Sequence, residues 1–387
     1  MRASAFVYPW DVDGDPEAPA RIAGLGVAQA TLASAYHSTR ALTPRHPRHR
    51  VVTAPHAAVL YRADGARWAG RRLRPYPAGD WAPGDAFGTA AEALAGAGLE
   101  VHTWVVLAHN SRLGEEFPDT SVVNAYGDRY PWAPCVAQPE TREYLVDLAA
   151  EAAVRPGARG TELESLGWYG LAHLHAHDKI AGVGLGEAGQ YLMSLCFCPA
   201  CRDGYGRHGL DPDELAAAVR RALEPVWRGE ASDAGWETVE KLLGAGPAAA
   251  TRAWRDAVAR ELQTDAVTAV RAAAPDGFRI LLHADPVSYH CGANAGVDPA
   301  HVLSVADGVV VPCTGSPALL TPFAEQGRGI LAANLTVVRG MGGSPHTLAA
   351  DAARAAALGA RELRLYHAGL ASDEDLEQVR EALRELR

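Results

Sequence analysis

Two glutamates and a run of histidines give residues 161–177 a high density of reactive side chains. The segment reads TELESLGWYGLAHLHAH, and its first residues form an apolar run that is typical of a short strand. Because side chains alternate along a strand, Glu162 and Glu164 share one side and Leu163 takes the other. We expect Glu164 to lie at the end of the strand and Glu162 one layer deeper, where burial would favour the protonated form of a general acid. The structural alternative is a buried salt bridge to an arginine or histidine of a neighbouring strand.

Two aspartates at the ends of other apolar runs could supply a second carboxylate. Asp285 follows FRILLHA and Asp11 follows SAFVYPW, and either could act as base or nucleophile opposite Glu164. Both also have a structural interpretation. Asp285 precedes Pro286 and could cap a turn or helix, and Asp11 lies in an aspartate-rich turn.

Further polar and aromatic side chains follow strand-like runs and could orient sugar hydroxyls or stack on a sugar ring. These candidate substrate-binding residues are His37, His109, Asn110, Trp168, His173, His175, Asn334 and His367. A single histidine is more often a hydrogen-bonded structural residue. His173, His175 and His177 alternate, so in an extended segment they would share a face as a metal site or proton relay. We favour a loop in which one or two of them contact the substrate or Glu164.

Three closely spaced cysteines have the spacing of a structural metal site. Cys196, Cys198 and Cys201 form a Cys-x-Cys-x-x-Cys motif, and four thiolates would complete a closed tetrahedral zinc site. Cys135, just before an amphipathic stretch, is the natural fourth ligand. The alternative is a group of buried free thiols. The two remaining cysteines, Cys291 and Cys313, are expected to be ordinary small buried residues.

The elements that would position these residues alternate between apolar runs and alanine-rich amphipathic stretches. Eight candidate strands begin near residues 4, 31, 99, 161, 278, 306, 329 and 362. Candidate helices span 16–28, 86–97, 139–154, 250–274, 299–306, 317–326, 344–358 and 373–386. This alternation implies right-handed crossovers and a parallel sheet, and eight units predict an α/β fold, the (β/α)8 or TIM barrel. No Gly-x-Gly-x-x-Gly follows the first strand, which disfavours a doubly wound sheet.

Long insertions follow strands 2, 3 and 4 of the predicted barrel, at 38–85, 111–138 and 167–250. Because each one lies between a strand and its helix, all three belong to the face where barrel active sites lie. We expect one TIM-barrel domain over 1–387, with a β-hairpin insertion at 38–85 turning around Asp64-Gly65. The insertion at 167–250 would be helical and would carry the cysteine motif.

The bulk properties restrict the possible partners and location. The chain has 387 residues, 48% of them hydrophobic, and a formal net charge of −10, which disfavours nucleic acid and anionic membranes as partners. No run of 18 apolar residues and no signal-peptide core occur, so we expect a cytoplasmic protein. A small carbohydrate-like substrate is compatible with these properties, and they do not fix the oligomeric state.

Several of these motifs resemble a known group of proteins. NAYGDRYPWAPC, QPETREYL, ELESLGWYG and YLMSLCFCPACR resemble uncharacterised glycoside-hydrolase-like barrel proteins over about residues 99–207. The cysteines are also similar to the zinc site of the family 42 β-galactosidases. That resemblance implies a structural zinc held by Cys135, Cys196, Cys198 and Cys201.

The sequence departs from the family 42 pattern at both catalytic positions. Leu163 stands where that family has asparagine before its acid/base, and the seventh strand offers Asn334 and no carboxylate. A second alignment would place the acid/base at Glu187, which we rank below Glu164. The first hypothesis is therefore a glycoside-hydrolase-like enzyme with Glu164 as acid. The alternatives are an inactive sugar- or metabolite-binding barrel and a metal-dependent lyase or isomerase.

Overall fold

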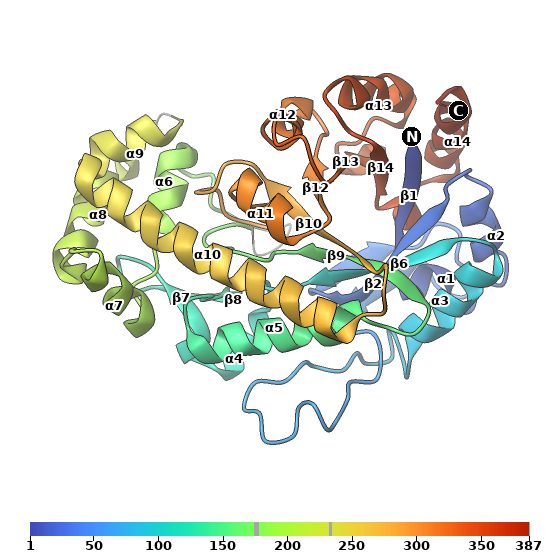
Figure 1. Cartoon of the computed structure of the whole chain (residues 1–387), viewed down its shortest axis with the longest axis horizontal. Coiled ribbons are helices and arrows are strands. Elements are labelled where there is room, and N and C mark those ends of the chain that lie inside the picture. The colour runs from blue at the N-terminus through green and yellow to red at the C-terminus, as the bar shows by residue number, and fades with distance from the viewer. Residues whose placement is uncertain (174–177, 232–233, 387) are drawn as a thin grey trace.

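Eight parallel strands form the closed barrel at the centre of the molecule (Figure 1). They are β1 (Arg2–Val7), β2 (Gln29–Tyr36), β6 (Glu100–Val106), β9 (Ala158–Glu164), β10 (Arg279–Asp285), β12 (Gly308–Pro312), β13 (Ile330–Thr336) and β14 (Glu362–Tyr366). The barrel closes because β1 pairs with β2 on one side and with β14 on the other. The computed structural model describes residues 1–173, 178–231 and 234–386. The predicted (β/α)8 barrel is confirmed.

Helices follow the strands in the predicted order. They are α2 (Ala18–Ala23), α3 (Ala86–Gly96), α5 (Pro139–Ala153), α10 (Ala245–Ala273), α11 (Pro299–Val305), α12 (Thr321–Ala324), α13 (Leu348–Ala357) and α14 (Asp373–Glu385). Several begin at a side-chain cap, as in α14, where the Ser372 hydroxyl accepts from the Asp375 amide at 3.0 Å. No helix within these described ranges is both long and apolar enough to cross a membrane.

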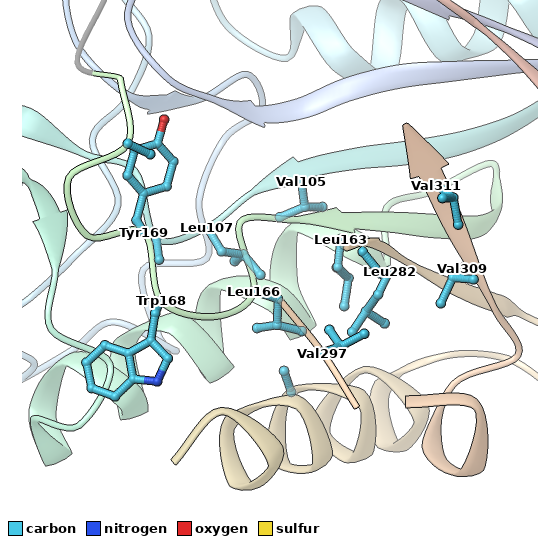
Figure 2. Packing of buried hydrophobic residues seen from close by; sticks show 14 of the residues in the cluster. Val105, Leu107, Leu163, Leu166, Trp168, Tyr169, Leu282, Val297, Val309 and Val311 are labelled. Carbon is cyan, nitrogen blue, oxygen red and sulfur yellow. The ribbon is translucent and has the colours of Figure 1, made fainter. Parts of the chain in front are cut away.

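The outward side of the strands packs against helices and leaves the polar side chains inside the barrel. Leu163, Leu282, Val309 and Val311 are fully buried on the outward side of β9, β10 and β12, together with Val297 (Figure 2). Burial of such a branched side chain contributes about 1.5–3 kcal/mol. Since this side of β9 is apolar, the period of two directs the alternate residues of β9 into the barrel.

The insertion at 38–85 contains a hairpin at a different place from the predicted one. β3 (Thr39–Leu42) and β4 (Val51–Ala54) pair with each other, whereas β5 (Ala58–Val59) pairs with β2. The hairpin predicted around Asp64-Gly65 is wrong. The Asp64 amide and the Trp68 indole both donate to Glu151 of α5, so this apolar segment packs on the barrel wall and not on itself.

The two other insertions cover one side of the molecule beyond the carboxyl ends of the strands. The first holds α4 (Ser111–Glu116), β7 (Ser121–Val123) and β8 (Arg129–Pro134), and the second holds α6 (Gly186–Met193), α7 (Pro199–Arg207), α8 (Pro212–Trp227) and α9 (Trp236–Leu243). In Figure 1 the four helices α6 to α9 gather at the left, next to the long α10. Short α1 (Pro9–Val12) and β11 (Ala295–Gly296) lie in the loops after β1 and β10.

Candidate active site

Glu162 lies inside the barrel in an ion pair. The Arg364 guanidinium of β14 donates from Nε to Oε1 of Glu162 at 2.6 Å, and the Thr31 hydroxyl donates to the same oxygen at 3.3 Å. Burial raises the pKa of Glu162, but the charge of Arg364 and the neighbouring His283 outweigh it and lower that pKa to about 2. The expectation that Glu162 is protonated is therefore wrong. The buried salt bridge, the structural alternative, describes its environment.

Glu164 lies two residues further along β9, at the mouth of the barrel. The Trp104 indole donates to its Oε2 at 2.7 Å, and the side chain is 3% exposed. Burial raises the pKa of Glu164, and the nearby charge of Glu162 adds to the increase, while His283 and Trp104 oppose it. Glu164, rather than Glu162, is thus the carboxyl group that the structure favours in its protonated form.

His283 of β10 lies between the two carboxylates. Its Nε2 is 3.6 Å from Oε2 of Glu162, and its Nδ1 is 3.8 Å from Oε2 of Glu164. One imidazole thus adjoins two carboxyl groups whose pKa values are shifted in opposite directions, an arrangement that can pass a proton between layers.

Aromatic rings surround Trp104 and form the wall of the mouth. Phe6 lies 4.7 Å and Tyr36 4.7 Å from Trp104 between ring centroids, and Tyr8 lies at 5.4 Å. The Tyr8 hydroxyl donates to the Tyr36 hydroxyl at 2.9 Å and lies 3.0 Å from Nδ1 of His367. This wall is apolar with a few fixed polar groups, as small-molecule sites generally are.

Three of the predicted histidines lie at this mouth. Burial lowers the pKa of His37 to about 4 and that of His367 to about 3, so both rings are neutral near pH 7. The His109 ring stacks on Tyr169 at 4.3 Å and lies 4.8 Å from His37. Neutral imidazoles of this kind can donate to and accept from a sugar hydroxyl.

Backbone strain also marks the mouth. Among the described residues, the non-glycine positions with positive φ are Ser165 at 57° and His367 at 61°, which directly follow β9 and β14. Strain of this kind clusters at functional sites, because the surrounding structure must hold it in place.

Three other predicted substrate-binding residues, Asn334, Asn110 and Trp168, have different surroundings from one another. Asn334 of β13 is 7% exposed, and its buried Oδ1 has no partner among the described residues. Asn110 caps α4, because its Oδ1 accepts from the Leu113 amide at 3.1 Å. The Trp168 indole donates to the Arg255 carbonyl of α10 at 3.0 Å and points away from Tyr169 (Figure 2). Trp168 therefore packs the insertion and does not line the mouth.

His173 is the one member of the histidine run within the described ranges. Its Nε2 lies 3.3 Å from the Tyr169 hydroxyl. His175 and His177 lie outside the described residues. Over the part of the chain that is described, the group of side chains able to hold a metal consists of the four cysteines alone.

Asp285 opens onto a pocket next to the mouth. Its Oδ1 accepts from the Val287 amide at 2.8 Å, and its Oδ2 lies 3.0 Å from Nδ1 of His290. Nε2 of His290 lies 3.8 Å from Oε2 of Glu187, so one imidazole joins the two carboxylates. Burial lowers the pKa of His290, but Asp285 and Glu187 raise it overall. The pocket has a volume of about 370 Å³.

Asp11 lies in the first turn of α1, shortly after the end of β1. Its Oδ2 accepts from the Tyr8 amide at 2.9 Å in the capping box of α1, and its Oδ1 is buried with no partner among the described residues. Burial raises the pKa of Asp11 to about 7, against the Tyr8 amide and Arg45. Asp11 thus forms a local hydrogen bond, as expected for the alternative in which it is a structural residue of a turn.

The four predicted cysteines form one buried cluster. Cys135 precedes α5, the other three lie at the start of α7, and their sulfur atoms all lie within 4.8 Å of one another. Sγ of Cys135 is 3.6 Å from Sγ of Cys198 and 3.6 Å from Sγ of Cys201. This donor set fits a tetrahedral metal ion and would join the insertions after strands 3 and 4.

Sequence reasoning missed three side chains of this site. Arg364 is the one charged residue inside the apolar run LRLY, and His283 shares the inward side of β10 with Asp285. The sequence contains a signal for both, because a charged or polar side chain in the middle of a buried strand needs a partner inside the barrel. His290 carries no such signal, since it lies in an irregular loop after β10.

Comparison with known proteins identifies solved structures that share this fold. No family model and no curated protein matches the sequence. The α-L-fucosidase isoenzyme 2 of Paenibacillus thiaminolyticus matches with a TM-score of 0.59 and 12% identity over 100% of this chain and 49% of its own. The catalytic domain of a β-amylase from Paenibacillus polymyxa matches with a TM-score of 0.56 and 12% identity, over 100% and 98%.

A third structure with this fold is a GH42 β-galactosidase from G. stearothermophilus, in a catalytic mutant. It matches with a TM-score of 0.54 and 12% identity over 100% of this chain and 56% of its own. The chain thus spans about half the length of the fucosidase and the galactosidase and nearly all of the β-amylase domain. At this identity the likenesses establish a barrel fold shared with glycoside hydrolases.

Proposed function

We propose that this chain is a glycoside-hydrolase-like enzyme that acts on a carbohydrate at the mouth of the barrel, with Glu164 as general acid. The observation that carries the proposal is the contrast between two glutamates on one strand. The pKa of Glu162 is lowered by Arg364, and the pKa of Glu164 is raised by burial. Paired carboxyl groups with divergent pKa values are a hallmark of acid/base sites. The barrel shared with a fucosidase, an amylase and a galactosidase supports the substrate class.

Asp285 is the second carboxylate of this proposal. In the register of β9 and β10, Leu163 pairs with Leu282, so Asp285 lies two residues beyond the level of Glu164. At about 3.3 Å per residue, this offset is about 6.6 Å along the strand. Inverting glycosidases separate their carboxyl groups by about 6.5–9.5 Å, and retaining ones by about 5–5.5 Å. Because the backbone positions alone are offset by more than the retaining distance, we propose an inverting reaction in which Asp285 activates a water molecule.

Leaving-group dependence tests the role of Glu164. The Glu164→Gln variant should lose about 10²- to 10⁴-fold in kcat/KM on oligosaccharides, whose leaving oxygen needs a proton. On 4-nitrophenyl glycosides, whose leaving group departs without protonation, the loss should be much smaller. Asp285→Asn is the matched comparison and should lose activity on both substrate types. Full oligosaccharide activity in Glu164→Gln would exclude Glu164 as the acid.

A binding protein without turnover is the second candidate, and one observation favours it. β13 reads ILAANLT and presents Asn334 where a carboxylate would complete a retaining pair. Calorimetry with the same oligosaccharides distinguishes the two functions. Binding without product, unchanged in Glu164→Gln, would support the binding protein over the hydrolase.

The cysteine cluster is proposed to hold a structural zinc ion. Its buried sulfur ligands come from two insertions, and zinc in such a closed site stabilises the fold and has no open position for substrate. Elemental analysis should give one zinc per chain, and Cys135→Ser should lower both metal content and thermal stability. The control Cys313→Ser changes a thiol outside the cluster and should leave the metal content unchanged.

A further inference from the structure

The guanidinium of Arg255 is buried in a place where a positive charge is costly. Arg255 of α10 is 2% exposed, and its Nη1 donates to the Ser194 carbonyl at 2.8 Å. The rings of Trp168 and Tyr191 lie 4.8 Å and 5.1 Å from its central carbon. Within the described part of the chain, no carboxylate forms an ion pair with Arg255. Buried charges are normally paired, so a group other than a carboxylate must contact the other Nη atom of Arg255.

That partner is the sulfur atom of Cys291. Nη2 of Arg255 donates to Sγ of Cys291 at 2.8 Å. By comparison, the amides of Val123 and Cys198 donate to Sγ of Cys196 at 3.4 Å. The guanidinium therefore places its charge and an N–H donor directly against this sulfur atom, in the kind of electropositive surroundings in which cysteines are reactive.

Cys291 is also accessible, unlike the other cysteines. It is partly exposed and lines the 370 Å³ pocket together with Glu187, Asp285 and His290. Cys313 is 3% exposed, and burial raises its pKa to about 12. The expectation that Cys291 is an ordinary buried residue is therefore wrong. Reactive cysteines occupy electropositive, partly exposed positions of this kind.

We propose that Cys291 is a nucleophilic cysteine, activated by Arg255, that is modified by small disulfides entering this pocket. The sulfur anion attacks one sulfur of the disulfide RS–SR, a new S–S bond forms to Cys291, and the old S–S bond breaks. The leaving RS⁻ takes a proton from solvent, so the electrons balance within the disulfide that enters. The adduct would occupy the pocket onto which Asp285 opens. The reactivity itself follows from the thiol environment and does not depend on hydrolysis.

The rate of modification tests this proposal directly. We would add 2,2′-dipyridyl disulfide to the zinc-loaded native protein, follow the released pyridinethione and locate the adduct by peptide mass mapping. Cys291 should react about tenfold faster than free cysteine at pH 7. A mapped rate at Cys291 equal to or below that of free cysteine would overturn the proposal. The native rate alone decides this, whatever the behaviour of variants.

Two arginine variants then assign the cause. Arg255→Met should lower the rate at Cys291 to the level of free cysteine or below. Arg252 is the matched control, because it stacks on Tyr289 of the same pocket at 5.5 Å but donates to Ser288 and not to the sulfur. Arg252→Met should keep the native rate. Equal slowing in both variants, each shown to be folded by circular dichroism, would exclude activation by Arg255.

Discussion

Two glutamates lie in successive layers of the barrel interior, Glu162 in the lower and Glu164 in the upper, and their pKa values are shifted in opposite directions. In the lower layer, Glu162 contacts a guanidinium, and Arg364 also donates to Glu362 at 2.8 Å. In the upper layer, Glu164 accepts from the neutral indole of Trp104. Both carboxyl groups are buried, so burial alone does not separate them. The difference teaches that the charge of the nearest donor decides which buried carboxyl group keeps its proton.

The largest expected effect comes from removing the cation of the lower layer. Arg364→Met leaves Glu162 as an uncompensated buried charge and should lower the free energy of unfolding by about 3–5 kcal/mol. Urea denaturation followed by circular dichroism would measure this. The exposed Arg361 provides the control, and Arg361→Met should change stability by less than about 0.5 kcal/mol. A loss below about 1 kcal/mol in Arg364→Met would contradict the ion pair.

Acid should destabilise the protein through the lower layer, because Glu162 is the buried carboxylate whose ionised form the folded state favours. The folded-state pKa of Glu162 is about 2, below the unfolded value of about 4.5, so its contribution is complete above pH 4.5. It is lost as the pH falls from about 4.5 through about 2, and amounts to on the order of 3 kcal/mol. Unfolding free energies measured between pH 6 and 2 should fall along this window in the native protein. In Glu162→Gln the slope should be reduced; an unchanged slope would contradict the assignment.

The two isosteric glutamine variants give the cleanest comparison of the layers. Glu162→Gln removes the charge that Arg364 needs and should cost about 1–3 kcal/mol, because a charged hydrogen bond is lost. Glu164→Gln replaces a group already favoured as neutral and should change stability by less than about 1 kcal/mol. Thermal unfolding of both variants side by side measures the difference. Equal losses would mean that the layers do not differ.

The smallest effect concerns the donor to Glu164. Trp104 stabilises the ionised form of Glu164, so Trp104→Phe should raise the pKa of Glu164 further, by up to about 1 unit. Activity that needs protonated Glu164 falls as the pH rises through this pKa. The alkaline limb of the pH–rate profile should therefore move upward in Trp104→Phe. A downward shift would contradict this account, and Tyr366→Phe, which keeps the indole, should leave the limb in place.

The barrel could be predicted from the sequence because each strand and helix is local. Alternation along 158–164 was also enough to direct both glutamates inward. The partner of Glu162 could not be predicted in this way, since Arg364 lies 202 residues away and reaches it only when the barrel closes. The assignment of the proton to Glu162 was wrong for this reason. The depth of Glu162 in the barrel raises its pKa, but the charge of Arg364 lowers it by more.

For the insertions, too, one feature could be predicted from the sequence and another could not. Cys135 could be proposed as the fourth ligand because two insertions after neighbouring strands belong to one rim. The prediction of a hairpin around Asp64-Gly65 is wrong, because the apolar runs on either side could pair with each other or pack against the outer helices of the barrel. Only Glu151 of α5, which accepts from Trp68 at 2.7 Å, shows which one is formed.

The ionisation state of Glu164 tests the central claim most directly. Infrared spectra at pH 6 would record the carbonyl band of protonated carboxyl groups in the native protein, in Glu164→Gln and in Glu162→Gln. The account predicts that Glu164→Gln loses part of this band and that Glu162→Gln keeps it, because burial raises the pKa of Glu164 and the charge of Arg364 lowers the pKa of Glu162. A band unchanged in Glu164→Gln, or lost in Glu162→Gln, would contradict the assignment of Glu164 as the acid.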